Sequence, residues 1–347
     1  MTSVQRYMPA VDGLRAVAVL MVFVVHTYAE YMPGGWIGVD IFFVISGFLI
    51  TGLLLREFEL TGKVSVSQFY IRRIFRIFPA LVVCVTAVAL LLPWTLHGPD
   101  DLAHLNVAAA LLGFMNWIRA LSPATGGSIG HTWSLGIEEQ FYLIWVVVIV
   151  LTPRKSTILV LAATGLVAMA AWRAGLAYSG ASVARLYNGL DTHGDGLLVG
   201  AALAALPRKL PSSLVRLWPI PAAFLALAAL TVSEKLPIVA YGGLTVISLA
   251  CGWIVYAAAV GSAGLQSLGG PLPVWLGKRS YSFYLWHMPI IGALPALGLS
   301  RSMWVLPALA LSVLAAALSY SFVERPFLAL KDRVNPAAHA PKRRQAI

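Results

Sequence analysis

Long apolar segments alternate with short polar ones along most of the chain. A helix needs about 20 apolar residues to cross the hydrocarbon core of a bilayer. Ten segments approach or reach that length: 12–30, 37–55, 77–96, 137–152, 156–173, 191–206, 217–232, 238–260, 280–298 and 304–323. The pattern predicts an all-α fold, a polytopic transmembrane helical bundle of about ten spans over residues 1–330, with a basic cytoplasmic tail over 331–347.

An additional apolar stretch at 103–118 is shorter and contains His104 and Asn106. It is compatible with a re-entrant or interfacial helix, or with an eleventh span. With ten spans and a cytoplasmic N-terminus, 19 Lys and Arg fall in the cytoplasmic segments and five in the outer ones. An eleventh span would invert every later loop, so the positive-inside rule favours ten spans with both termini cytoplasmic.

The composition agrees with a membrane protein. Hydrophobic residues make up 59% of the chain and charged residues only 11%, whereas about a quarter of a soluble domain is charged. The net charge is +11. Because the basic residues lie in short loops, where they face anionic headgroups, membrane lipids rather than nucleic acid are the expected partners.

Several kinds of site have no matching pattern in this sequence. Cys84 and Cys251 lie in separate apolar runs and form no CxxC pair. No spacing typical of metal ligands, nucleotide-binding glycine loops or nucleophile elbows is present, so no metal is expected. The first apolar segment follows Asp12 and Arg15 without a small-residue cleavage site, which predicts a retained span rather than a signal peptide.

Ionisable residues inside predicted spans are candidates for function, because charge is costly in a bilayer. Near the outer side these residues are His26, Asp40 and Glu138. A carboxylate beside His26 can orient its imidazole and raise its basicity. The structural alternatives are a packing histidine for His26 and dipole-stabilised helix starts for Asp40 and Glu138.

A second group of ionisable residues lies near the cytoplasmic side: Arg15, Arg72, Arg73 and Arg76. The last three cluster on one side of a helix by their spacing, and guanidinium groups match phosphates well. The alternative is a lipid-headgroup anchor. Arg15 and His26 share one helix face, about 16 Å apart along the axis.

This polarity indicates a substance that enters phosphate-first from inside and reacts near the outside. The residues alone do not name the group that moves. A transporter or flippase for a lipid-linked sugar or small acid uses similar charges, although the internal repeat common in transporters is missing. A non-catalytic membrane scaffold or sensor is the other alternative.

At these same residues the sequence strongly resembles the acyltransferase-3 family of membrane O-acyltransferases. The resemblance rests on motifs that occur in the family's order and run almost from end to end: Tyr7–Ala16 with His26, Gly38–Phe48, Arg72–Ala80, Thr132–Leu135 with Glu138–Tyr142, Ser280–His287 and Glu324–Phe327.

The resemblance implies ten spans in the bacterial cytoplasmic (inner) membrane. It implies transfer of an acyl group from cytoplasmic acyl-CoA, usually acetyl-CoA, to a hydroxyl of an extracytoplasmic carbohydrate or glycoconjugate. By its motifs, Arg15, Arg73 and Arg76 correspond to donor-handling positions. His26 corresponds to the catalytic histidine and Glu138 to the acidic residue of the Ser-Leu-x-x-Glu pattern.

The mechanism expected from this resemblance runs from the inner cluster to the outer one. The CoA phosphates bind Arg72, Arg73 and Arg76, and the pantetheine arm passes Arg15 to reach His26. His26 then either deprotonates the acceptor hydroxyl or accepts the acyl group itself. Glu138, together with Asp40, is expected to orient His26, while His287 is expected to be a packing histidine.

The sequence departs from the family's pattern in two respects. Where members often have Thr-Arg-x-Asp, this chain has Thr192-His193-Gly194-Asp195, which puts any binding role of that site in doubt. Some members also carry a C-terminal SGNH-type domain that completes transfer. Without one, the chain is expected to act alone or to hand the acyl group to a separate periplasmic transferase. The sequence does not identify the surface or exported carbohydrate that accepts it.

Overall fold

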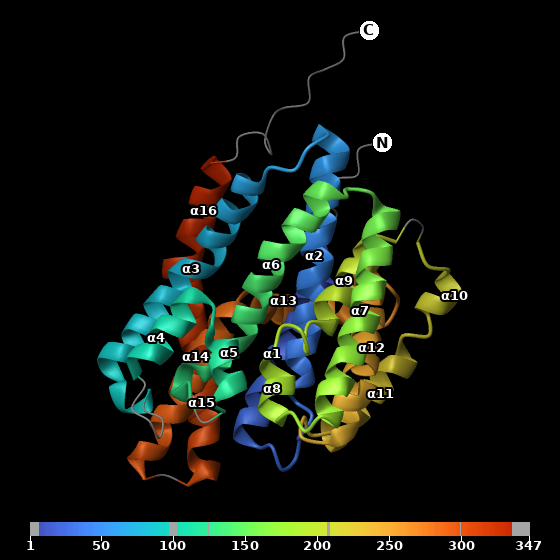
Figure 1. Ribbon diagram of the computed structural model, residues 1–347. Helices are drawn as coiled ribbons and strands as arrows, with labels where there is room; N and C mark the ends of the chain where they lie inside the picture. Colours follow the sequence, from blue (N-terminus) through green and yellow to red (C-terminus); the bar gives the residue numbers. More distant parts are fainter. Residues whose placement is uncertain (1–6, 97–102, 124, 207–208, 299, 335–347) are drawn as a thin grey trace.

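The computed structural model describes residues 7–96, 103–123, 125–206, 209–298 and 300–334, and these form a bundle of helices without any strand (Figure 1). This confirms the predicted all-α class. The α-helices are α1 (Pro9–Thr27), α2 (Ile37–Thr61), α3 (Val66–Leu91), α4 (Ala103–Leu112), α5 (Met115–Leu121), α6 (Trp133–Leu151), α7 (Lys155–Tyr178), α8 (Val183–Asn188), α9 (Asp195–Ala204), α10 (Ser212–Val215), α11 (Pro219–Thr231), α12 (Leu244–Ala259), α13 (Pro271–Lys278), α14 (Ser280–Ala293), α15 (Arg301–Ser319) and α16 (Arg325–Val334).

Eight helical stretches in the described residues are long and apolar enough to cross a membrane. They are Pro9–Thr27, Ile37–Thr61, Val66–Leu91, Gly127–Leu151, Lys155–Tyr178, Ser212–Thr231, Val239–Ala259 and Arg301–Leu330. Each contains or overlaps one of the ten predicted spans. The two remaining predictions, 191–206 and 280–298, correspond to the shorter helices α9 and α14, of 10 and 14 residues. The number of spans and the side of the termini remain predictions.

Two predicted boundaries differ from the structure. Helix α3 begins at Val66 rather than at residue 77, so its arginines lie within the helix and not before it. The stretch 103–118 is not one helix, because α4 ends at Leu112 and Gly113, with a φ of 73°, interrupts the chain before α5. The part of the predicted basic tail from residue 335 onward lies outside the described residues.

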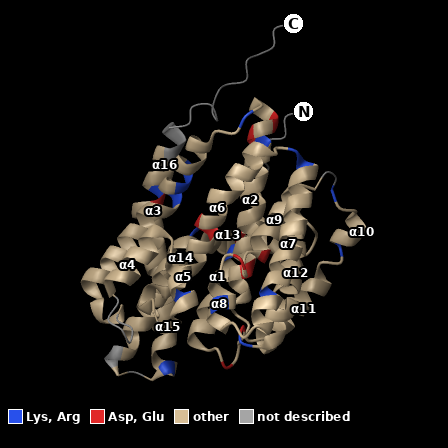
Figure 2. Cartoon of the chain, viewed as in Figure 1, with Lys and Arg blue, Asp and Glu red and all other residues tan. Residues whose placement is uncertain are grey.

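Charged side chains are distributed as a bilayer requires. Many leucine, valine and isoleucine side chains on the outer surface of the bundle are exposed, as on a face that contacts lipid. Figure 2 shows Lys and Arg near the two ends of the bundle and a small mixed group of charges in its middle. The residues of this middle group therefore need partners or a polar cavity.

The close contact between α2 and α9 holds the centre of the bundle together. A Cβ on Gly47 of α2 would lie 2.0 Å from the backbone oxygen of Leu197, and one on Gly200 of α9 would lie 2.1 Å from that of Val44. Small residues allow membrane helices to approach this closely. Helix α2 also packs against α1, α6 and α12, so its position affects those walls of the site described below that α1, α2 and α6 form.

We expect Gly47→Ala to destabilise the protein, because the added methyl group meets backbone atoms that cannot rotate away. Overpacking of this kind costs about 1–3 kcal/mol. The matched control is Gly52→Ala on the same helix, where the nearest atom to the new Cβ is 3.9 Å away. Thermal unfolding in detergent can be followed by the reaction of a thiol dye with Cys84 and Cys251, both of which are buried. Equal melting temperatures for the two variants would contradict the predicted packing.

Candidate active site

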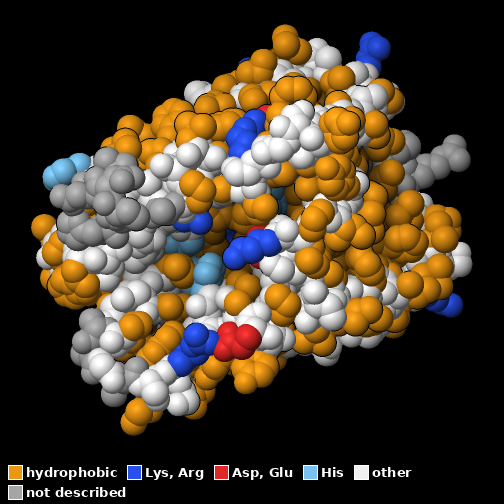
Figure 3. Space-filling view, turned by 60° about the horizontal axis from the view of Figure 1, so that its bottom comes forward, with side chains coloured by type: hydrophobic (Ala, Val, Ile, Leu, Met, Phe, Trp, Pro, Cys, Tyr) orange, Lys and Arg blue, Asp and Glu red, His pale blue; other side chains and the backbone are white. Residues whose placement is uncertain are grey.

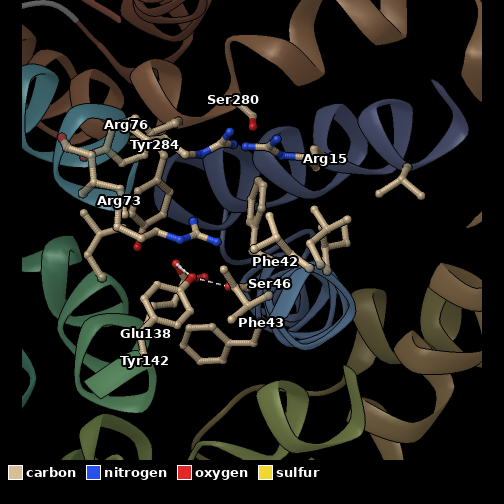
Figure 4. Close-up of a pocket in the computed structure, with 18 of the residues that line it drawn as sticks. Arg15, Phe42, Phe43, Ser46, Arg73, Arg76, Glu138, Tyr142, Ser280 and Tyr284 are labelled. Atoms are coloured by element: carbon tan, nitrogen blue, oxygen red, sulfur yellow. Dashed lines mark hydrogen bonds between the residues drawn. The ribbon is translucent and has the colours of Figure 1, made fainter. Parts of the chain in front are cut away.

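A pocket of about 530 Å³ lies between α1, α2, α3, α6 and α14 (Figure 4). It extends from Tyr7 and Asp12, near the start of the chain, to Ser134 and Tyr284 in the interior. All four arginines predicted to handle the donor line it: Arg15, Arg72, Arg73 and Arg76. We refer to it as the arginine pocket.

The arginines of the pocket differ in their partners. Arg72 forms an ion pair with Glu57 at 3.2 Å, and Arg15 lies 4.0 Å from Asp12. The guanidinium of Arg73 stacks 4.7 Å from the centre of the Tyr142 ring. Among the described residues, Arg76 has neither a hydrogen-bond nor an ion-pair partner.

Figure 4 shows the guanidinium groups of Arg15, Arg73 and Arg76 directed into the same space. Positive charges repel one another at this range unless an anion lies between them. Guanidinium forks bind phosphate and carboxylate groups through paired hydrogen bonds. The pocket is therefore suited to an anionic ligand with several oxygen acceptors.

Glu138 lies in the arginine pocket rather than beside His26. Its carboxylate accepts a 3.1 Å hydrogen bond from the hydroxyl of Tyr142, which also bonds to Ser46 (Figure 4). Among the described residues no hydrogen bond joins Glu138 to His26, so the expected contact between them is not formed in this structure. Tyr142 and Ser46 were missed by the sequence reasoning, which considered charged groups only.

Asp40 is fully buried and also lies apart from His26. Its Oδ1 accepts a 3.2 Å hydrogen bond from the hydroxyl of Ser248 on α12 and lies 3.4 Å from Nε2 of His193. The expected contact with His26 is again absent from the described residues. Asp40 instead links α2 to α12 and to the turn before α9.

The departure at Thr192–Asp195 has a structural counterpart. His193, at the position where family members often have arginine, contacts Asp40, and its Nδ1 lies 2.6 Å from the carbonyl oxygen of Tyr187. Asp195 pairs with Arg173 at 2.6 Å, and both side chains are buried. Arg173 is one of the five Lys and Arg residues that the ten-span prediction places in the outer segments, but it lies within α7, inside the protein.

A cluster of three histidines lies near the end of α1, and we call it the histidine cluster. Nδ1 of His26 is 3.2 Å from Nε2 of His287 on α14. The His287 ring centre is 5.2 Å from that of His26 and 5.2 Å from that of His131, in the 3₁₀ helix η2 (Gly127–Thr132). The prediction that His287 serves only in packing overlooked its contact with His26. The position of His287 inside an apolar predicted span was the feature of the sequence that could have marked it as a functional candidate.

The three histidines differ in their access to the surface. His131 and His287 are buried, whereas His26 is exposed. Figure 3 shows a hollow in this end of the molecule with histidine and arginine side chains in it. His26 is therefore the member of the cluster that a molecule outside the bundle can reach.

Tyr284 on α14 lies between the arginine pocket and the histidine cluster. It lines the pocket, and its hydroxyl bonds to Ser134 at 2.7 Å and to the carbonyl oxygen of His131 at 2.6 Å. Its ring centre is 5.0 Å from that of His131 and 5.5 Å from that of His287. One side chain thus contacts both regions.

No group of three or more His, Cys, Asp or Glu side chains within the described ranges is arranged to hold a metal ion. The residues that the structure brings together favour anion binding at the arginine pocket. They favour acid–base chemistry at the histidine cluster.

Comparisons with known proteins show which family the chain is similar to. Residues 8–324 match the family described as "Acyltransferase domain". The peptidoglycan O-acetyltransferase OatA of Listeria monocytogenes is 33% identical over 93% of this chain. "Putative peptidoglycan O-acetyltransferase YrhL" of Bacillus subtilis is 32% identical over 94% of it.

The matched regions cover 56% and 55% of those two relatives, so the chain spans about half the length of the curated relatives it matches. No solved structure matches the chain. Since the family match covers nearly the whole chain, from the start of α1 to the end of α15 and beyond, the protein belongs to the acyltransferase-3 family of membrane acyltransferases.

Proposed function

We propose that this protein is a multi-pass O-acyltransferase of the bacterial inner membrane. It moves an acyl group, acetyl in the simplest case, from cytoplasmic acyl-CoA to a hydroxyl of an extracytoplasmic carbohydrate. The observation that carries the proposal is the contact of Tyr284 with both the arginine pocket and the histidine cluster. Relatives named for O-acetylation of peptidoglycan make a cell-wall glycan the first acceptor to test.

The donor binds in the arginine pocket. CoA carries a 3′-phosphate and a pyrophosphate, and these supply anionic oxygens to Arg73 and Arg76, which have no ion-pair partner among the described residues, and further acceptors to Arg15, which lies 4.0 Å from Asp12. Arg72, already paired with Glu57, contributes charge at the mouth of the pocket. The aromatic and aliphatic walls of the pocket then receive the apolar part of the pantetheine arm.

The thioester reaches the histidine cluster along α1. Arg15 and His26 are eleven residues apart on this helix, which corresponds to about 16 Å. An extended pantetheine arm is comparable in length, so phosphates held by the arginines leave the thioester near Tyr284 and His26. The acceptor approaches from the surface at which His26 is exposed.

His26 acts as the general base. It takes the proton of the acceptor hydroxyl as the oxygen attacks the thioester carbonyl, the C–O bond forms and the C–S bond breaks. The proton then passes to the departing CoA thiolate. Transfer through an acyl-imidazole on His26 balances equally well in two steps.

His131 contributes a hydrogen-bond donor near the reacting carbonyl. Both of its ring nitrogens are buried without a partner among the described residues. A neutral imidazole always carries one N–H, and a buried donor without an acceptor costs about 1–3 kcal/mol. The carbonyl oxygen of the acyl group supplies such an acceptor as negative charge develops on it.

We expect His26→Ala to lower turnover of acetyl-CoA at least about 100-fold, the usual effect of losing a general base, while CoA binding persists. Turnover is measured as CoA release by purified protein in nanodiscs, with peptidoglycan fragments as acceptor. The matched control is His104→Ala, which removes an exposed histidine on α4. Full turnover by His26→Ala would contradict the assigned role. A wild type that consumes no acetyl-CoA would favour the transporter alternative.

We also expect Arg73→Ala and Arg76→Ala each to raise the dissociation constant of CoA about 10- to 100-fold, because each removes charge-assisted hydrogen bonds. Arg73→Lys should fall between wild type and Arg73→Ala, since it keeps the charge but loses the fork. Arg154→Ala, which removes an exposed arginine between α6 and α7, is the control. Calorimetry in nanodiscs measures these constants. Unchanged affinity in both alanine variants would place the donor elsewhere.

A further inference from the structure

A continuous chain of hydrogen bonds runs from the backbone of α14 to the exposed end of the histidine cluster. The carbonyl oxygen of Tyr284 lies 2.6 Å from Nδ1 of His287. Nε2 of His287 lies 3.2 Å from Nδ1 of His26. Each contact involves at least one imidazole nitrogen, so each one constrains which ring nitrogens carry a hydrogen.

The first contact fixes the tautomer of His287. A backbone carbonyl oxygen can only accept a hydrogen bond, so Nδ1 of His287 must carry the hydrogen. A neutral imidazole has a single N–H, which leaves Nε2 of His287 with a lone pair. A charged His287 would need a counterion, and this fully buried ring contacts no carboxylate within the described ranges.

The second contact then fixes the tautomer of His26. Because Nε2 of His287 is an acceptor, Nδ1 of His26 must donate its hydrogen to it. The single N–H of neutral His26 is thereby used, and its Nε2 is left unprotonated. That nitrogen is not the one that contacts His287, and it is left for a molecule that reaches exposed His26.

We propose that His287 is a positioning residue that holds His26 in the Nδ1–H tautomer, so that Nε2 of His26 is the basic nitrogen presented to the acceptor hydroxyl. The inference rests on the proposed role of His26. It assigns to a neutral histidine the orienting function that sequence reasoning gave to Glu138 and Asp40. Both carboxylates have other partners in the structure.

This arrangement differs chemically from a carboxylate–histidine pair. A carboxylate both orients the imidazole and stabilises its cation, whereas neutral His287 orients the ring without adding a negative charge to the site. The orienting group is itself anchored to the backbone of α14, three residues from Tyr284. The same turn of α14 therefore carries His287, which orients His26, and Tyr284, which contacts both the arginine pocket and the histidine cluster.

Two substitutions distinguish positioning from packing. His287→Phe keeps a planar ring of similar size but removes the acceptor. His287→Gln keeps an acceptor, because its Oε1 can lie close to the position of Nε2. We expect His287→Phe to lower kcat about 100-fold or more, with KM for acetyl-CoA changed less than about twofold. His287→Gln should retain at least about tenfold more activity than His287→Phe.

The tautomer itself is measurable without turnover. In protein labelled with ¹⁵N-histidine, the imidazole signals that disappear in His26→Ala belong to His26. We expect them to report the Nδ1–H form in the wild type and in His287→Gln, and a shift toward the Nε2–H form in His287→Phe. Retained CoA affinity in His287→Phe shows that the fold is intact.

Three results would overturn the proposal. The first is an Nε2–H form of His26 in the wild type, and the second is wild-type turnover in His287→Phe. The third is that His287→Phe and His287→Gln lose the same amount of activity and the same amount of CoA affinity. A wild type that shows the expected tautomer but consumes no acetyl-CoA would instead overturn the proposed function and leave the positioning geometry supported. The spectroscopic measurement therefore tests the positioning of His26, and the kinetic measurement tests the proposed function, independently of each other.

Discussion

The cost of placing charged and polar groups in a low-dielectric interior governs how this bundle is built. Most such groups are neutralised locally. Arg173 pairs with Asp195, and Asp40 is held by Ser248 and His193. The arginine pocket is different, because among the described residues four arginines line it and only two carboxylates, those of Asp12 and Glu138, line it with them. A pocket left positive inside a membrane protein is most simply explained by an anionic ligand that completes it.

The same constraint explains why the site has two parts. Phosphates require cations and an aqueous approach, whereas deprotonation of a hydroxyl requires an uncharged base in reach of the acceptor. These needs are met by α1 at its two ends, with Arg15 near the start and His26 near the end. Tyr284 contacts both parts, and its hydroxyl is held by Ser134 and the backbone of His131. In the proposed function, the bundle therefore keeps donor and acceptor apart while their reacting groups remain close.

Hydropathy and spacing were sufficient to predict the helical class, the eight long apolar helices and the arginines that line the pocket, because these depend on local sequence. Within the predicted span 191–206, α9 begins only at Asp195, since apolar composition does not reveal the turn at Gly189–Gly194, whereas 280–298 corresponds to α14 and the 3₁₀ helix Leu294–Leu297 that continues it. The histidine cluster depends on contacts between residues 261 apart in the chain, for which one sequence holds no pattern. Glu138 and Asp40 were assigned to His26 from their predicted depth and from the family resemblance, whereas Glu138 bonds to Tyr142 one turn along α6 and Asp40 contacts Ser248 and His193.

Transfer of the acyl group across the bundle is tested most directly in sealed proteoliposomes that contain acetyl-CoA labelled in the acetyl group. Peptidoglycan fragments are added only to the outside. We predict that label appears on the external fragments while CoA stays in the lumen, and that His26→Ala abolishes this transfer. Label that reaches the fragments only when donor and acceptor share one side of the membrane would contradict the proposed route, and so would the appearance of intact acetyl-CoA outside.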